Sequence, residues 1–267
     1  MDDIVALGLL EDEAIELDSA ALQLASFDHP DVDLDPYLET LGEITDQLGQ
    51  AGASAHRTAE QADALAFVLG ATHGFAGDRR TYDDPDNADM IRVIDRRRGL
   101  PVSLSILYVA AARRVGWAAE VLNTPGHVLI RVGGETEPLL LDPFSEGAVV
   151  GAEALQRLLS GVLGRSVAPS SEHLAPMTNR GVLVRLLLNQ ATRAEAAGRP
   201  GRALTLFERI TAVAPDNAHG WWERARLQLV HRDVTGARSS LSAMLEVTRD
   251  PTVRAHALAA LDSIAGG

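Results

Sequence analysis

Apolar residues recur at helical spacing along the first 75 positions. The run over residues 11–26 has its alanines and leucines on or near one side, which is typical of a helix with one buried face. Asp35-Pro36 is typical of a helix start, with an N-cap residue before a proline in the first turn, so we expect a helix to about residue 49. A third helix is expected over residues 55–72, with Gly74 as its C-terminal stop.

The pattern changes after a polar, broken stretch at residues 76–98. Pro101 suits the first turn of a new helix, and Gly116 suits its end. Three short strand-like runs follow, at residues 119–122, 128–132 and 137–141. Gly133-Gly134-Glu135 is a hairpin signal between the last two runs. This segment therefore predicts a helix followed by antiparallel strands.

Beyond residue 180 the pattern is helical throughout and contains an internal repeat. Ala203 and Ala237 lie 34 residues apart, and each belongs to an amphipathic helix that is followed by a proline, Pro215 or Pro251. A 34-residue period is that of tetratricopeptide helix pairs; an unrelated helical bundle with chance spacing is the alternative. A closing helix is expected over residues 252–264.

Together these patterns predict a mostly helical α+β fold with a small antiparallel sheet and a helical-repeat tail. We expect a helical part over residues 1–75 packed on the core, a core over residues 76–175, and tetratricopeptide-like repeats over residues 176–267. Trp221-Trp222 opens the second repeat. We expect one of these rings in the core and the other on a groove, where it would bind a peptide.

Composition removes several kinds of chemistry. The 267 residues contain no cysteine, which excludes disulfides, thiolate catalysis and cysteine metal sites. They contain no lysine either, which excludes Schiff-base chemistry and a P-loop lysine. The net charge of −13 is uneven: residues 1–180 have a net charge of −16 and residues 181–267 a net charge of +3. An acidic surface repels phosphate, so nucleic acid is not an expected partner.

The chain has no run of about 18 or more apolar residues, so we expect no transmembrane helix and no membrane partner. Its start, Met1-Asp2-Asp3, lacks the basic residues of a secretory signal, and a cytoplasmic protein is expected. The acidic residues at 83–89 lack the glycine and glutamate of a calcium loop. The eight histidines include no His-x-x-x-His pair, so neither metal nor cofactor is expected. For Arg96-Arg97-Arg98 we expect salt bridges to neighbouring acids rather than phosphate binding.

The hairpin register brings two polar residues together. If residues 133–136 form the loop, Val132 lies opposite Glu137, and counting outward places His127 opposite Asp142. Opposite residues share one face with Cβ atoms about 5 Å apart, so imidazole and carboxylate would lie within hydrogen-bond reach. Such a pair is the base and orienting half of a catalytic triad. A purely structural pair at the sheet end is the alternative.

Several stretches around this pair carry a family resemblance. They are His73-Gly74-Phe75-Ala76-Gly77-Asp78, Arg97-Arg98-Gly99-Leu100-Pro101-Val102-Ser103-Leu104-Ser105, Pro125-Gly126-His127 and Leu141-Asp142-Pro143-Phe144. Over about residues 65–250 the chain resembles the SirB1 family. That family is similar to the transglutaminase-like superfamily, a branch of the papain-like cysteine enzymes, and is often followed by tetratricopeptide-like repeats.

The resemblance implies a Cys-His-Asp triad. His127 and Asp142 fall at the His and Asp positions, and Pro101 falls where the cysteine would stand, as it often does in the SirB1 pattern. Proline offers neither a nucleophile nor a backbone N–H. Ser103 points away from that position, and Ser105 lies one helical turn deeper. The resemblance therefore implies a pseudoenzyme.

Two functions follow as expectations. The first is a non-catalytic module that binds a protein or peptide. The second is a hydrolase or acyltransferase in which His127 acts as base with Ser105 or water, and Asp142 orients it. A purely structural role for the pair is a third reading, and the oligomeric state is open.

Overall fold

The computed structural model describes residues 2–134, 136–163 and 170–265. They form two compact units, one of Ile15–Val182 and one of Met1–Ala14 with Leu183–Gly267. This division differs from the three parts expected above, because helix α1 (Asp2–Leu9) packs against helix α9 (Pro200–Val213). Gly8 permits that contact, since a Cβ there would lie 2.1 Å from the Ala212 carbonyl oxygen. The first residues therefore belong with the C-terminal helices.

Helices dominate the larger unit, as the apolar spacing predicts. They are α2 (Leu17–Ser26), α3 (Asp35–Ala51), α4 (Thr58–Leu65), the π-helix η2 (Ala66–Thr72), the 3-10 helix η3 (Pro85–Ala88), α5 (Met90–Arg96), α6 (Pro101–Arg114) and α7 (Ala152–Leu163). The expected helix at 11–26 is divided, with a 3-10 turn η1 (Asp12–Ala14) before α2. The expected helix at 55–72 continues from α4 into η2, and Gly74 follows it with φ +73°.

Four antiparallel strands form the sheet, in the order β3-β4-β5-β6. They are β3 (Ala119–Leu122), β4 (Leu129–Val132), β5 (Leu139–Asp142) and β6 (Ala148–Val149). The 3-10 turn η4 (Pro143–Ser145) joins β5 to β6. A separate pair of short parallel strands, β1 (Ala76–Gly77) and β2 (Arg98–Gly99), lies within the stretch that the sequence marks only as polar and broken.

The β4–β5 register differs from the expected one by two residues. Val132 pairs with Leu139 and Ile130 with Leu141, so the connection between the strands spans residues 133–138 rather than 133–136. Pro138 accounts for the longer connection, because proline has no N–H to donate to the ladder. The shift is an even number, so each residue keeps the face that the alternation predicts.

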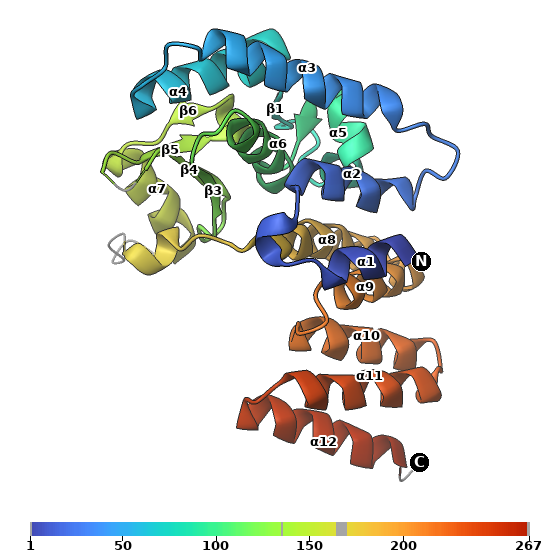
Figure 1. Cartoon of the computed structure of the whole chain (residues 1–267). Coiled ribbons are helices and arrows are strands. Elements are labelled where there is room, and N and C mark those ends of the chain that lie inside the picture. The colour runs from blue at the N-terminus through green and yellow to red at the C-terminus, as the bar shows by residue number, and fades with distance from the viewer. Residues whose placement is uncertain (1, 135, 164–169, 266–267) are drawn as a thin grey trace. The chain divides into compact units, whose positions relative to one another are not determined.

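Helix α6 is the centre of the larger unit. All residues from Pro101 to Ala112 are buried, which explains why its apolar residues are not confined to one side. It packs against α2 and α3, against β3 and β4, and against η4 (Figure 1). Because α6 is buried on all sides, packing in the core fixes the side chains that it directs toward η4.

The other unit is built from helices that stack in chain order. After α8 (Asn179–Ala196) come α9, α10 (Ala218–Val230), α11 (Val234–Val247) and α12 (Pro251–Ala265). Helix α10 packs against α9 and α11, and α11 packs against α12 (Figure 1). Ala203 and Ala237 are both fully buried at equivalent places in α9 and α11. The helical tail is therefore present, and its tetratricopeptide character stays a prediction.

Candidate functional site

His127 and Asp142 form the side-chain pair that the sequence predicts. The Nε2 atom of His127 lies 2.9 Å from Oδ1 of Asp142. Their side chains are 15% and 13% exposed, so the pair is shielded but open to solvent on one side. His127 precedes β4 in a turn where its N–H donates to the Thr124 carbonyl and Gly126 has φ +72°. Because Asp142 occupies Nε2, the other ring nitrogen, Nδ1, is the one available to a ligand.

Asp142 is held in place by the turn that it begins. It ends β5 and caps η4, with Oδ1 accepting a hydrogen bond from the Phe144 N–H at 3.0 Å. Its carbonyl accepts a second bond from the Gly147 N–H. Burial alone would raise the pKa of Asp142, but hydrogen bonds from His127, Ser145 and Phe144 lower this pKa below its ordinary value. The carboxylate is therefore charged at neutral pH and orients the imidazole.

The turn after Asp142 is wedged against the core. Gly147 has φ +79°, and a Cβ there would lie 2.9 Å from the Tyr108 ring and 3.1 Å from Ala66. A Cβ at Gly70, in the π-helix, would lie 2.8 Å from the Glu146 carbonyl oxygen. These close approaches fix the turn, and with it the carboxylate, to helices on two sides.

An aromatic and cationic wall adjoins the imidazole. The Phe144 ring meets the His127 ring edge to face at 6.0 Å and meets Tyr82 at 5.8 Å. The Arg79 guanidinium lies over the Phe144 ring at 5.5 Å and donates a hydrogen bond to Ser145. Gly77 leaves room for this ring, since a Cβ there would lie 2.4 Å from it. The sequence analysis did not identify Arg79, Tyr82 or Ser145 as site residues, because no local spacing relates them to His127.

Helix α6 supplies the other predicted positions. Pro101 is the first residue of the helix and is buried. Its side chain has no nucleophilic group, and its backbone nitrogen carries no hydrogen. Ser103 is a structural residue: its hydroxyl donates to the Asn87 carbonyl at 2.7 Å and accepts from the Leu100 N–H. That Ser103 points away from the nucleophile position stays a prediction. That Pro101 stands at the nucleophile position remains a prediction.

Ser105 is fully buried, and its hydroxyl has no hydrogen-bond partner within the described residues. The Tyr108 hydroxyl, nearly one turn further along α6, is likewise buried without a partner there. Burial raises the pKa of Tyr108 well above its ordinary value, and the nearby charges of Glu146 and Asp142 raise it further. Neither hydroxyl is exposed to a substrate in solution.

The remaining predictions concern surface features. Arg96 forms the expected salt bridges, to Asp78 at 3.0 Å and to Asp84 and Asp86 at longer range. Arg98 instead donates to backbone carbonyls, including that of Gly74.

In the described part of the chain, no cluster of three or more histidine, aspartate or glutamate side chains could hold a metal, and no helix is long and apolar enough to cross a membrane.

The tryptophans of α10 differ from expectation. Trp221 and Trp222 are both half-buried, and both pack against the hydrophobic cluster that includes Ala225 and Leu241. The Trp221 Nε1–H donates to the Pro215 carbonyl, and the Arg224 guanidinium lies over the Trp221 ring. Both rings contribute to this packing, whereas we expected one in the core and the other on a groove. Peptide binding by these residues stays a prediction.

A second His–Asp pair was missed by the sequence analysis. Nε2 of His29 lies 2.7 Å from Oδ2 of Asp89, which also caps α5 through the Arg92 N–H. Sixty residues separate the two, so no local pattern indicates their contact. The pair shows that such geometry alone does not define a site. What sets His127 apart is the aromatic and cationic wall beside it.

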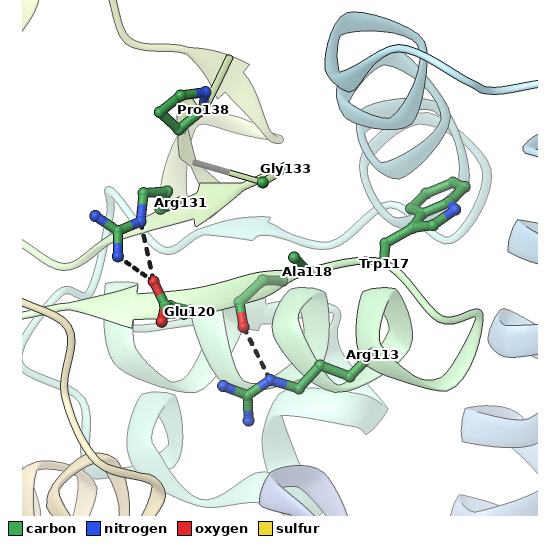
Figure 2. Close-up of a pocket in the computed structure, with 9 residues that line it drawn as sticks. Arg113, Trp117, Ala118, Glu120, Arg131, Gly133 and Pro138 are labelled. Atoms are coloured by element: carbon green, nitrogen blue, oxygen red, sulfur yellow. Dashed lines mark hydrogen bonds and ion pairs between the residues drawn. The ribbon is translucent and has the colours of Figure 1, made fainter. Parts of the chain in front are cut away.

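A hollow lies at the opposite end of β4 from His127. Its volume is about 590 Å³, and it is lined by residues of α6, β3, β4 and the 133–138 connection (Figure 2). Figure 2 shows Arg113 reaching from α6 to donate to the Ala119 carbonyl, while Arg131 pairs with Glu120 on the adjacent strand. These charged groups are engaged with one another or with the backbone, so we do not assign the predicted chemistry to this hollow.

Comparison with known proteins places this geometry in a family. Residues 35–188 match the family model described as the transglutaminase-like superfamily. The chain is 31% identical to a UPF0162 protein of Xylella fastidiosa (strain 9a5c) over 91% of this chain and 87% of the relative. It is 39% identical to part of the human F-box only protein 21, over 31% of this chain and 13% of that protein.

The structural comparison gives menin, at 13% identity and a TM-score of 0.43 over 92% of this chain and 69% of the menin chain. That score is too low to support an inference about fold or function. The match over residues 35–188 covers more than half of the chain and includes both His127 and Asp142. The chain therefore belongs to the transglutaminase-like superfamily.

Proposed function

We propose that this protein is a non-catalytic transglutaminase-like module that binds a protein or peptide beside His127 and Asp142, with Pro101 in the position of the lost cysteine. The observation that carries the proposal is a formed imidazole–carboxylate pair in a chain without any cysteine. A thiolate mechanism needs a sulfur that this chain does not contain. The His127–Asp142 pair and the adjoining Phe144 and Tyr82 rings still offer a surface that can bind a peptide.

The binding surface has the features of a peptide site. Tyr82 and Phe144 present aromatic rings, and the Nδ1 atom of His127 offers a hydrogen-bonding group beside them. Aromatic rings next to a few fixed polar groups are typical of small-ligand and peptide sites. We also propose that the domain is of the SirB1 type and that the protein is cytoplasmic. The C-terminal helices would be tetratricopeptide-like repeats, with a second peptide-binding surface at Trp221 and Trp222.

The second candidate is a hydrolase or acyltransferase. It is favoured by the orientation of His127, whose Nε2 bond to Asp142 leaves Nδ1 free to act as a base. Ser105 serves poorly as the nucleophile, because it is fully buried. A water activated by His127 would be the alternative nucleophile.

Turnover and binding assays on the same preparations separate the two functions. We expect a positional library of fluorescent octapeptides to bind the wild type and to bind His127→Ala at least about fivefold more weakly, as loss of a hydrogen-bonding group in a binding site predicts. His256→Ala, which changes an exposed histidine on α12, is the matched control and should leave binding unchanged.

The same library, blocked at both ends and followed by mass spectrometry, measures amide hydrolysis. The non-catalytic proposal predicts no products above those of a protein-free blank. Products that appear with the wild type and vanish with His127→Ala would establish the enzyme instead. Equal peptide binding by the wild type and His127→Ala would reject this site. Loss of peptide binding in Trp221→Ala alone would show that the peptide binds at α10 instead.

A further inference from the structure

Arg79, like Arg80, Arg97 and Arg98, forms no salt bridge within the described residues of the larger unit. Others pair with carboxylates: Arg57 with Glu60, Arg92 with Asp95, Arg96 with Asp78, Arg114 with Asp18, and Arg131 with Glu120. Within the described ranges, Arg79 has no carboxylate partner, although residues 1–180 have a net charge of −16. Its side chain is exposed. A cation that finds no acid in so acidic a domain is available to an anionic ligand.

The guanidinium of Arg79 is also held in one place. One Nη atom donates to the Ser145 hydroxyl at 3.0 Å, while the guanidinium carbon lies 5.5 Å from the centre of the Phe144 ring. A hydrogen bond and a cation–π contact together restrict a side chain that otherwise has many rotamers, which lowers the entropy lost on binding. Arg80, the next residue, has no side-chain hydrogen bond or ion pair in the part of the chain described.

Arg79 is connected to the proposed binding site through the same two residues. The Phe144 ring, over which the guanidinium lies, also meets the His127 ring. Ser145, which accepts from Arg79, follows Phe144 in the η4 turn that Asp142 caps. The cation and the imidazole of the imidazole–carboxylate pair therefore share one neighbour, the Phe144 ring.

We propose that Arg79 binds a carboxylate of the ligand that occupies the surface beside His127, so that the site selects peptides that present a carboxylate there. The inference rests on the proposed function and specifies its ligand. A guanidinium presents two parallel N–H donors that match a carboxylate, and the remaining Arg79 donors are not used by Ser145. An extended peptide rises about 3.3 Å per residue, so a carboxylate two or three residues from the group at His127 would reach Arg79.

The carboxylate has two sources, an Asp or Glu side chain and a free C-terminus. Three matched sets of fluorescent octapeptides separate these sources. The first set has Asp or Glu side chains and an amidated C-terminus, and the second has Asn or Gln instead and a free C-terminus. The third, neutral set has Asn or Gln and an amidated C-terminus. Fluorescence anisotropy at 150 mM salt gives Kd for each set with the wild type, Arg79→Gln, Arg80→Gln, Ser145→Ala and His127→Ala.

We expect the wild type to bind one of the carboxylate sets about tenfold or more tightly than the neutral, amidated set, as a charge-assisted pair predicts. Arg79→Gln should remove that preference and leave Kd for the neutral set unchanged. Arg80→Gln should keep the preference, because Arg80 is not held against Phe144. Ser145→Ala should reduce the preference partly, since it frees a guanidinium that keeps its charge.

Equal binding of all three sets by the wild type, with both carboxylate and neutral binding lost in His127→Ala, would overturn the role of Arg79 and leave the proposed function standing. Equal losses in Arg79→Gln and Arg80→Gln would also overturn it, because they indicate a diffuse charge effect. Absence of binding in every set would reject the proposed function together with this inference.

Discussion

His127 and Asp142 lie 2.9 Å apart although they are not partners in the β4–β5 ladder. His127 lies outside the ladder, because β4 begins two residues later, at Leu129. The β4–β5 pairing is also shifted by two residues from the register that would place His127 opposite Asp142. The contact is made instead by a turn that ends at His127 and by the N-cap position of η4. Two pieces of local geometry, rather than the ladder, hold the pair.

Asp142→Asn tests how much the charge of this pair contributes. The amide oxygen still caps η4, but the ion-assisted bond to His127 is lost, so we expect a loss of about 1–2 kcal/mol in the free energy of unfolding at pH 7. Because the pKa of Asp142 is lowered in the folded state, its stabilisation is present above pH 4 and is lost as pH falls. Urea unfolding curves of the wild type and variant should therefore converge in acid. Asp31→Asn, at an exposed position, is the control.

Tyr108→Phe tests the buried hydroxyl on α6. Because the hydroxyl is fully buried and has no partner in the described part of the chain, its removal should change the free energy of unfolding by no more than about 0.5 kcal/mol. Tyr108→Ala should cost about 3–5 kcal/mol, since it empties the space against Gly147 and Ala66. A large loss in Tyr108→Phe, measured by thermal or urea unfolding, would mean that the hydroxyl has a bonding partner such as a buried water.

Gly77→Ala tests the space under Phe144. The added Cβ would lie 2.4 Å from that ring, so the ring must move, and we expect a cost of about 1–3 kcal/mol together with weaker peptide binding. Gly42→Ala is the matched control. Gly42 is exposed within α3 with no atom within 4 Å of the added Cβ, so this change should stabilise the protein by about 0.5–1 kcal/mol. Unchanged stability and binding in Gly77→Ala would show that Phe144 is not fixed in place.

Arg114→Ala tests the buried acid of α2. Asp18 is almost fully buried and is held by two bonds from Arg114, at 2.5 and 2.7 Å. Removing the arginine leaves a buried carboxylate without its counter-ion, which typically costs 3–5 kcal/mol. Arg157→Ala, which breaks an exposed pair with Glu153, should cost less than about 0.5 kcal/mol.

The Arg114→Ala defect should also depend on pH. Burial raises the pKa of Asp18 above its ordinary value even with Arg114 present. A raised carboxyl pKa means that the folded protein takes up a proton before the unfolded chain does, so falling pH favours the folded state of the variant. Its deficit relative to the wild type, followed by urea unfolding from pH 7 toward pH 4, should shrink. A constant deficit would show that the lost contribution is packing rather than charge.

Features that depend on neighbours along the chain are readable from the order of the amino acids alone. The helix that starts at Pro101, the strands near residues 119–141 and the faces of those strands follow from apolar spacing and from the positions of proline and glycine. The proximity of His127 and Asp142 also follows, because they flank one hairpin, although the expected register is wrong and the turn before β4 and the η4 cap make the contact.

Contacts between residues that are distant in the chain become visible only in the folded protein. Helix α1 belongs with the C-terminal helices, His29 bonds to Asp89, and Arg79 lies over Phe144, and none of these contacts has a local signal. Local periodicity records which face of an element is buried, but not against what it is buried. The partner is set by the packing of complete elements around α6, where small differences such as the missing Cβ of Gly77 determine which ring fits.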